Sequence, residues 1–257
     1  MSSNYDLKED IRDYWSQRSK SFDRAFGHKI EKGLEAEAWA QPMRDHLGET
    51  PKRVLELACG TGEVTRLVHD LGHDVTALDF SEDMLAVARL KHAGKDRLRF
   101  LLADAAQTME PADSYDAILC RHLVWTLVEP EVAFADWFRI LRPGGRILIY
   151  DGDWAKPQAS GRWAARLLAL WDKISPDEYY DGPISERHAT IMERLPFGEG
   201  LTFERLAPML EAAGFNSIKR LPHDPIAQAQ RRTCGLRNNL RTRVYSRFIL
   251  VAEKPSV

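Results

Sequence analysis

A short glycine-containing segment, Cys59-Gly60-Thr61-Gly62, directly follows a run of apolar residues that is typical of a buried strand. Glycine lets the backbone approach a ligand closely and adopt dihedral angles that are closed to other residues. Seventeen residues past Gly62, Asp79 ends a second apolar run. A carboxylate there can accept hydrogen bonds from two neighbouring ribose hydroxyls. Together these features predict a site for a cofactor that carries a ribose.

The residues around the glycines bear on which cofactor this is. The pattern reads Gly60-x-Gly62-x-x-Thr65, so the third glycine of the dinucleotide fingerprint is absent. Glu56 precedes the loop and Glu63 follows it. Acidic groups repel a pyrophosphate but suit a ligand that carries an ammonium and a sulfonium. The pattern therefore disfavours NAD.

His122 is the candidate catalytic base, because it follows another buried run and a neutral imidazole can accept a proton from a substrate hydroxyl, thiol or ammonium. A structural hydrogen-bonding role for this histidine is equally open. Asp151 and Asp153 follow a further run and are rival polar groups at the rim of the site. Trp125 and Trp154 are candidates to line the acceptor site, with plain packing as the alternative.

Alternating strands and helices must position these residues. Short buried strands that alternate with helices predict an α/β fold, a doubly wound parallel sheet covered on both faces. Ligands bind beyond the carboxyl ends of such strands, where the glycine segment is expected. Asp6 and Glu9 resemble a capping box, and Ser81 is a good helix cap. The predicted strands are 53–58, 74–79, 97–102, 115–120 and 146–151, with two more near 215–221 and 244–253; the predicted helices are 7–26, 31–47, 63–71, 82–92, 131–142 and 202–213.

We expect one domain over 1–257 with two additions to the sheet. Residues 1–48 form an N-terminal helical cap and 50–151 the cofactor-binding core, in which Pro143-Gly144-Gly145 stops a helix. Residues 152–200 form an inserted substrate cap rich in aromatics, including Tyr179 and Tyr180. Residues 201–257 complete the sheet, with about twenty irregular residues between the last two strands.

Composition excludes several classes of protein. The chain has 257 residues and a formal net charge of −2, which argues against a general nucleic-acid-coating role. Its apolar runs fall short of a membrane span and its start does not resemble a secretion signal, so we expect a cytoplasmic protein without a membrane partner. Its three cysteines predict neither a disulfide framework nor a zinc site, and we expect no metal. Cys59 lacks an evident base and is expected to be a packing residue.

The core also resembles a known family. Val54–Glu63 resembles the first motif of class I S-adenosylmethionine-dependent methyltransferases, and Ala77–Leu85 resembles the second. Leu102–Ala105 resembles the third motif, while Tyr115–Leu119 and Leu141–Arg146 resemble the fourth strand and the turn before the fifth. The resemblance implies a Rossmann-like seven-stranded sheet whose last strand is antiparallel.

The N-terminal segment Tyr14–Asp23 resembles the cap of small-molecule members related to ubiquinone and menaquinone methyltransferases. Those proteins usually carry alanine where Ser19 stands and tyrosine where Phe22 stands. Tyr14 and Arg18 lie one helical turn apart and share a face. Either they cover the methionine end of the cofactor, with Arg18 near its carboxylate, or they are a packed tyrosine and an exposed arginine.

Position by position, the resemblance implies how the cofactor is held. Gly60 and Gly62 pass beneath the methionine part, and Asp79 binds the ribose hydroxyls. Met84 packs against the adenine, and Asp104 accepts from the adenine amino group. The Ala105 amide donates to a ring nitrogen of the adenine, and the backbone of Cys120 and Arg121 lies beside the methionine. The other expected cofactor residues are Tyr14, Arg18, Glu56, Thr61 and Phe80.

The sequence thus predicts methyl transfer from S-adenosylmethionine to a nitrogen, oxygen or sulfur nucleophile of a small molecule, with S-adenosylhomocysteine released. The expected acceptor residues are Trp125, Asp151 and Trp154, and His188 and His223 are expected to face solvent. The arginines of the tail (Arg231, Arg232, Arg237, Arg241, Arg243 and Arg247) are either a solvated face or a grip for an anionic acceptor.

Three alternatives remain at this stage. A methyltransferase acting on RNA or DNA would use the tail arginines on phosphates, although the residues after the fourth strand are Cys-Arg-His-Leu rather than the Asn/Asp-Pro-Pro-aromatic stretch of enzymes that methylate base amino groups. The others are a nicotinamide-dependent oxidoreductase and a non-catalytic domain that senses the cofactor.

Overall fold

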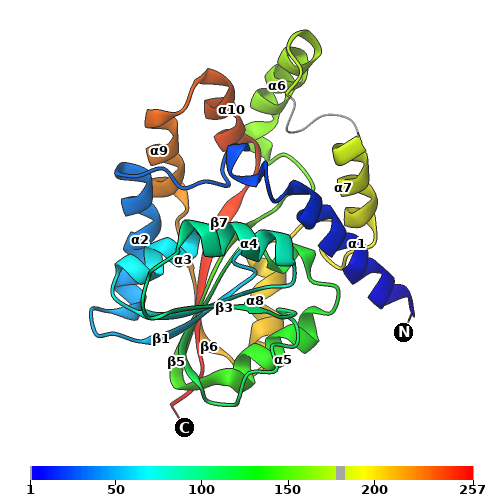
Figure 1. The fold of residues 1–257 in the computed structure, drawn as a ribbon. Helices are drawn as coiled ribbons and strands as arrows, with labels where there is room; N and C mark the ends of the chain where they lie inside the picture. Colours follow the sequence, from blue (N-terminus) through cyan, green and yellow to red (C-terminus); the bar gives the residue numbers. More distant parts are fainter. Residues whose placement is uncertain (1, 178–182, 257) are drawn as a thin grey trace.

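The computed structural model describes residues 2–177 and 183–256, and they are arranged around one mixed sheet (Figure 1). The seven strands lie in the order β3-β2-β1-β4-β5-β7-β6. All pairings among β1 to β5 are parallel, whereas β7 is antiparallel to both of its neighbours, β5 and β6. This confirms the predicted sheet. The strands are β1 (Arg53–Leu57), β2 (Asp74–Asp79), β3 (Leu98–Leu102), β4 (Tyr115–Arg121), β5 (Leu141–Gly152), β6 (Asn216–Leu221) and β7 (Arg247–Glu253).

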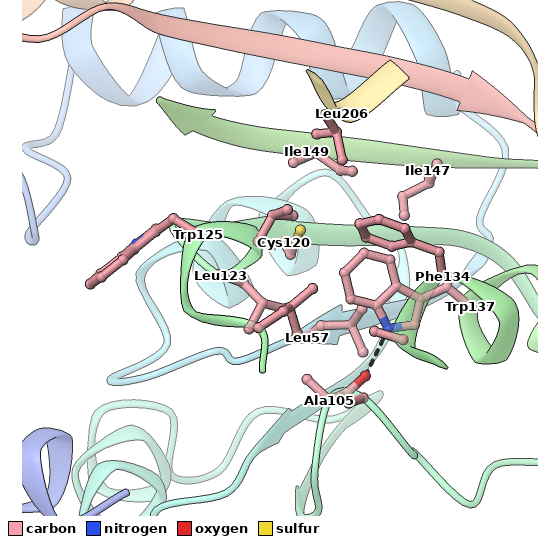
Figure 2. Packing of buried hydrophobic residues seen from close by; sticks show 14 of the residues in the cluster. Leu57, Ala105, Cys120, Leu123, Trp125, Phe134, Trp137, Ile147, Ile149 and Leu206 are labelled. Carbon is pink, nitrogen blue, oxygen red and sulfur yellow. Dashed lines mark hydrogen bonds between the residues drawn. The ribbon is translucent and has the colours of Figure 1, made fainter. Parts of the chain in front are cut away.

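Helices cover both faces of the sheet, which is why its central strands are apolar on both sides. Leu55 and Leu57 of β1 pack with residues of α5, α8, α1 and α7, whereas Val54 packs on the other face with residues of α2, α3 and α9. Figure 2 shows the first of these clusters. The helices are α1 (Ser2–Arg18), α2 (Leu34–Leu47), α3 (Glu63–Asp70), α4 (Glu82–Lys91), α5 (Pro130–Ile140), α6 (Arg162–Ile174), α7 (Pro183–Glu193), α8 (Phe203–Ala212), α9 (Asp224–Thr233) and α10 (Leu236–Val244), with short 3₁₀ turns η1 (Phe22–Arg24), η2 (Val124–Thr126) and η3 (Ala159–Gly161).

Several predicted boundaries are wrong. The helix expected over 7–26 begins at Ser2 and ends at Arg18, so Asp6 lies inside it and does not cap it. Pro143 and its two glycines lie in β5, next to the register shift in its pairing with β4, and do not end a helix. The capping role of Ser81 is confirmed, because its Oγ accepts from the Met84 amide.

The tail expected to be irregular contains α9 and α10. The α10 sequence, LRNNLRTRV, has only three apolar residues, too few for the pattern that predicts helices to stand out. Its buried apolar residues Leu240 and Val244 pack against Ala164 and Leu168 of α6. Tertiary packing thus stabilises a helix that its own sequence does not indicate.

Candidate functional site

A cavity of about 600 Å³ lies beyond the carboxyl ends of β1, β2 and β4. One end is lined by the glycine segment, and the other by residues of α1, α6, α7 and α10. The cavity thus occupies the position at which open α/β sheets bind ligands. Thirteen of the predicted site residues line it: Tyr14, Arg18, Glu56, Gly60, Asp79, Phe80, Met84, Asp104, Ala105, Arg121, His122, Trp125 and Trp154.

Asp79 organises the glycine end of the cavity. It is buried at the end of β2, and its two oxygens accept from the Gly60 amide at 2.8 Å and the Ser81 amide at 2.9 Å. Burial raises the pKa of the Asp79 carboxyl to about 6, and these backbone amides oppose that shift. Since two carboxylate oxygens offer about four acceptor sites, the side chain retains capacity for two further donors.

Gly60 and Gly62 must be glycine for different structural reasons. Gly60 lines the cavity with a φ of 54°, so a side chain there would adopt a backbone conformation that few residues tolerate. Gly62 does not line the cavity, but it has a φ of 83° and a Cβ there would lie 2.7 Å from His92 Nε2. Thr61 also faces away, and its hydroxyl donates to Asp23 of η1 at 2.6 Å. Gly62 and Thr61 therefore support the loop from behind.

A buried acid and a buried guanidinium face each other across the methionine end of the expected site. Burial raises the pKa of Glu56 to about 8, and its carboxyl accepts from the Thr65 hydroxyl. Arg121 donates from Nη2 to the His28 carbonyl at 2.6 Å and lies over the Trp39 ring. Its Nη1 is buried without a hydrogen-bond partner among the described residues. A buried N–H without a partner costs free energy, so this atom is available to a ligand.

Arg18 is a second such cation, on the last turn of α1. It donates from Nη1 to the Tyr14 hydroxyl at 2.8 Å, while its buried Nε has no hydrogen-bond partner among the described residues. Both side chains line the cavity. The pairing confirms that Tyr14 and Arg18 share a face of the helix.

At the opposite end of the glycine loop, Asp104 and Ala105 follow β3. One Asp104 oxygen accepts from the Ala106 amide at 2.8 Å, and the other accepts from Lys8 Nζ of α1 at 2.9 Å. The Ala105 carbonyl accepts from the indole of Trp137 at 2.7 Å (Figure 2). These bonds fix the β3 turn between α5 below and α1 above. Lys8 was not anticipated from the sequence.

His122 lies directly after β4 with a φ of 56°, and its amide donates to the Tyr150 carbonyl at 2.8 Å. Its ring packs edge-on against Trp154 at 4.7 Å between centroids. Burial, and then the Arg121 charge, lower the pKa of the imidazole well below its ordinary value. The histidine is therefore neutral near pH 7, and the same burial and charge make it a weaker base than a free imidazole.

Asp151 does not line the cavity, contrary to its expected role as an acceptor residue. Its oxygens accept from the Val124 amide, the Gly152 amide and the Trp154 indole, each at 2.8–2.9 Å. Burial raises its pKa to about 7. The side chain acts through Trp154, whose indole it orients. Cys120 does not line the cavity, and its side chain points into the core (Figure 2). Its expected contact to the methionine is through the backbone and stays a prediction.

Aromatic side chains line the acceptor end of the cavity. Trp125 of η2 packs against His188 of α7 at 5.3 Å, and His188 lies 6.0 Å from Tyr14. Tyr245 contacts Trp154 from the far side at 5.7 Å. The α1–α7 arrangement is held by two bonds to Asp10, a hydrogen bond from Arg187 to its carbonyl and an ion pair with Arg194.

The expectation that His188 and His223 face solvent is wrong. His188 lines the cavity, and burial lowers its pKa. His223 is buried edge-on against Trp39, and burial lowers its pKa to about 3. Nothing local in the sequence separates them from exposed histidines. Of the tail arginines, Arg241 and Arg247 line the cavity.

Other candidate chemistries find little support in residues 2–177 and 183–256. Burial raises the pKa of Cys59 and Cys120 well above the ordinary thiol value, so neither is a thiolate at neutral pH. No group of three metal-ligating side chains occurs among the described residues. No described helix is long and apolar enough to cross a membrane. Tyr179 and Tyr180, expected in the substrate cap, lie outside the described residues.

Comparisons with known proteins give a consistent result. Residues 55–149 match the family model described as a methyltransferase domain. The chain is 31% identical to a demethylmenaquinone methyltransferase of Deinococcus radiodurans, over 68% of this chain and 72% of that protein. It is 30% identical to a ubiquinone/menaquinone biosynthesis C-methyltransferase of Stutzerimonas stutzeri, over 65% of this chain and 66% of that protein.

With some other curated relatives, the match spans less than half of either chain. Among solved structures, the fold resembles a Haemonchus contortus phosphoethanolamine N-methyltransferase crystallised with phosphomonomethylethanolamine and S-adenosylhomocysteine. The TM-score is 0.59 at 16% identity, and the alignment covers 91% of this chain and 59% of that one.

Proposed function

The chain belongs to the class I S-adenosylmethionine-dependent methyltransferases, and on that premise we propose that it methylates a small-molecule acceptor held at the aromatic end of its cavity. One observation carries this proposal: the glycine end and the aromatic end form a single cavity of about 600 Å³. This volume is typical of small-molecule sites, which span roughly 300–1,000 Å³. Residues 1–48 and 152–200 then act as caps on one methyltransferase domain.

The residues present fit S-adenosylmethionine. Arg18 and Arg121 each have a buried N–H group without a partner among the described residues, and these groups suit its carboxylate, while Glu56 suits its ammonium. The spare acceptor sites of Asp79 suit two ribose hydroxyls. Met84, Asp104 and Ala105 line the part of the cavity left for the adenine, and the sulfonium supplies an electrophilic methyl group.

The chain's own residues orient the acceptor and exclude water, which lowers the barrier through proximity. Trp125, His188 and Tyr14 surround the acceptor end from η2, α7 and α1. His122 accepts the proton that the acceptor loses, since its imidazole is neutral and its side chain forms no hydrogen bond to any described residue. Asp151 and Trp154 position it.

The acceptor atom is a nitrogen, oxygen or sulfur nucleophile or, as the name of the Stutzerimonas relative adds, a carbon. Carbon was missing from the atoms considered on sequence grounds. A hydroxylated aromatic ring fits both the aromatic lining and His122, because loss of the hydroxyl proton makes the ring oxygen and the adjacent ring carbons nucleophilic. Arg241 and Arg247 line the same end, where Arg241 is paired with Asp177 and Arg247 lies over the Trp154 ring.

The proposal is tested in two steps with the full chain. Calorimetric titration with S-adenosylhomocysteine, with NADH in parallel, is expected to show micromolar binding of the first alone. Incubation with S-adenosylmethionine and a panel of phenols, hydroquinones, amines and thiols is then followed by mass spectrometry, in which fragmentation locates the added methyl group.

The other outcomes distinguish the alternatives. Binding of NADH alone would overturn the methyltransferase proposal. Binding of S-adenosylhomocysteine without turnover of any acceptor would favour a sensor. Methylation of RNA or DNA, with affinity that falls steeply as salt rises, would overturn the small-molecule acceptor.

A further inference from the structure

One helix at the acceptor end exposes a stripe of large apolar side chains. The stripe consists of Trp163, Leu167, Leu170 and Ile174 of α6, at intervals of four, three and four residues. Their exposed fractions are 50%, 47%, 58% and 85%. Single exposed apolar residues are ordinary, but a contiguous patch marks an interaction surface. Helix α6 lies at the edge of the molecule beside α10 (Figure 1).

The remaining faces of α6 are accounted for. Ala164 and Leu168 pack against α10, and Ala165, Leu168 and Ala169 line the acceptor end of the cavity. At 3.6 residues per turn, the stripe lies on the side of the helix opposite the cavity-lining residues. The four residues of the stripe therefore contribute neither to the cavity lining nor to the packing of α6 on α10.

The flank of the stripe is basic. Arg162, Arg166 and Lys173 are exposed, and helical geometry places them on one side, between the stripe and the cavity face. Lys156 is exposed just before the helix. None of the four forms an ion pair with a described residue. The acid of α6, Asp172, is paired with Arg237 of α10.

The neighbouring helix extends the same surface. Arg237 also donates to the Ser175 carbonyl at 2.8 Å, which holds the start of α10 against the end of α6. The adjacent Leu236 is a further large exposed apolar residue. The exposed surface thus combines tryptophan, leucine and isoleucine with a row of cations.

We propose that the α6 stripe docks this protein on the surface of an anionic lipid bilayer. An amphipathic helix of this composition lies in the interface, with leucine and isoleucine in the acyl boundary and tryptophan at the headgroup level. The basic flank meets lipid phosphates. A second copy of the chain fits less well, because an antiparallel self-complementary pairing of α6 would bring the two basic flanks to the same side.

Docking in this orientation would place α6 between the bilayer and the acceptor end of the cavity, because the stripe and the cavity-lining residues lie on opposite sides of the helix. The docking itself does not rest on the proposed function. It revises the expectation, drawn from the absence of long apolar runs, that the protein has no membrane partner.

The test is co-sedimentation of the full chain with vesicles of phosphatidylcholine alone and of phosphatidylcholine with phosphatidylglycerol in equal proportions. We expect binding to the anionic vesicles that weakens with salt. The double variant Leu167→Ser/Leu170→Ser should bind roughly tenfold more weakly or worse. The matched control is Leu90→Ser on α4, another highly exposed leucine, which should bind like the wild type.

A second pair of variants tests the charge. Arg162→Glu/Arg166→Glu should lose the preference for phosphatidylglycerol, whereas Lys219→Glu on the edge strand β6 should retain it. Thermal melting and S-adenosylhomocysteine binding, measured for every variant, verify the fold. The proposal is overturned if the wild type sediments with neither vesicle, or if the stripe variant binds as well as the control. It is also overturned if the wild type does not bind vesicles and sedimentation equilibrium shows that it forms a dimer that the stripe variant does not form.

Discussion

The two ends of the cavity are built in different ways. The glycine end takes its polar side chains from the strand ends and turns of β1, β2, β3 and β4, between residues 56 and 121. The acceptor end takes its side chains from α1, η2, α6, α7 and α10, which span almost the whole chain. The sheet topology therefore determines the first end, and the packing of separate helices determines the second.

The two ends also differ in how firmly their side chains are held. At the glycine end, Asp79, Asp104 and Glu56 each accept a hydrogen bond from a nearby loop or helix. At the acceptor end, the rings of His122 and His188 contact other rings but form no hydrogen bond to any described residue. We infer that the first end is preorganised and that the second adapts to its ligand.

The largest effect is expected from Asp79→Ala at the preorganised end. Removal of a carboxylate that would accept two ribose hydroxyls should weaken S-adenosylhomocysteine binding by about a hundredfold or more, since each bond to a charged group is worth about 1.5–3 kcal/mol. Calorimetric titration measures the change. Asp74→Ala, at the exposed start of the same strand, is the control and should bind normally. Unchanged affinity in Asp79→Ala would contradict the placement of the cofactor.

The acceptor end is tested by His122→Ala. Cofactor affinity should persist, whereas turnover of the acceptor should fall by about a hundredfold if the imidazole takes the acceptor's proton. Because His122 has a positive φ, His122→Asn serves as a backbone control, since asparagine tolerates that conformation better than alanine. Recovery of turnover in the asparagine variant would assign the loss to the backbone. His188→Ala should mainly raise the KM for the acceptor. This result would distinguish a residue that only contacts the acceptor from one that takes its proton.

The same contrast explains what the sequence could predict. Gly60, Asp79 and Asp104 were found because each follows a buried strand, and parallel strands align their carboxyl ends at one edge. Thr61, Gly62, Cys120 and Asp151 lie in the expected region but do not line the cavity. The side chains of Thr61 and Asp151 bond to neighbouring segments instead, and periodicity does not define which way a loop residue turns.

The residues missed from the sequence lie mostly at the acceptor end. His188 reaches the cavity only because α7 packs on α1, and Lys8 reaches Asp104 only because α1 crosses the β3 turn. Arg241 was one of six tail arginines with two open roles, and it reaches the cavity on α10, a helix that the sequence did not predict. Such positions depend on long-range packing, for which local pattern holds no signal.

A smaller effect should separate the two parts of the cofactor within the preorganised end. Arg121→Met removes a guanidinium whose buried Nη1 has no hydrogen-bond partner in the part of the chain that the structure describes. We expect affinity for S-adenosylhomocysteine to fall roughly tenfold or more. Affinity for methylthioadenosine, which lacks the amino acid, should not change. Equal losses for both ligands would mean that Arg121 supports the loop and does not bind the carboxylate.

The smallest effect is a dependence of stability on pH that arises from the same buried end. The folded protein holds protons on Glu56 and Asp151, whose pKa values are raised to about 8 and about 7, while the unfolded chain releases them at ordinary carboxyl values. Their stabilising contribution is complete below the unfolded pKa and is lost as the pH rises through the folded values. His28 and His223, with pKa values lowered to about 3, act in the opposite direction, but only below the ordinary histidine value of 6.5.

Above about pH 6.5 only the carboxyls contribute, so the melting temperature of the unliganded protein should fall by a few degrees towards about pH 9. Glu56→Gln removes one of the two titrations and keeps an oxygen for the Thr65 hydroxyl, so its melting curve should depend less on pH over this window. Glu37→Gln, an exposed carboxyl, should follow the wild type. An identical pH slope in Glu56→Gln would mean that Glu56 is already ionised in the folded protein. The positive charge of Arg121 would then stabilise the ionised Glu56 carboxylate before any ligand binds.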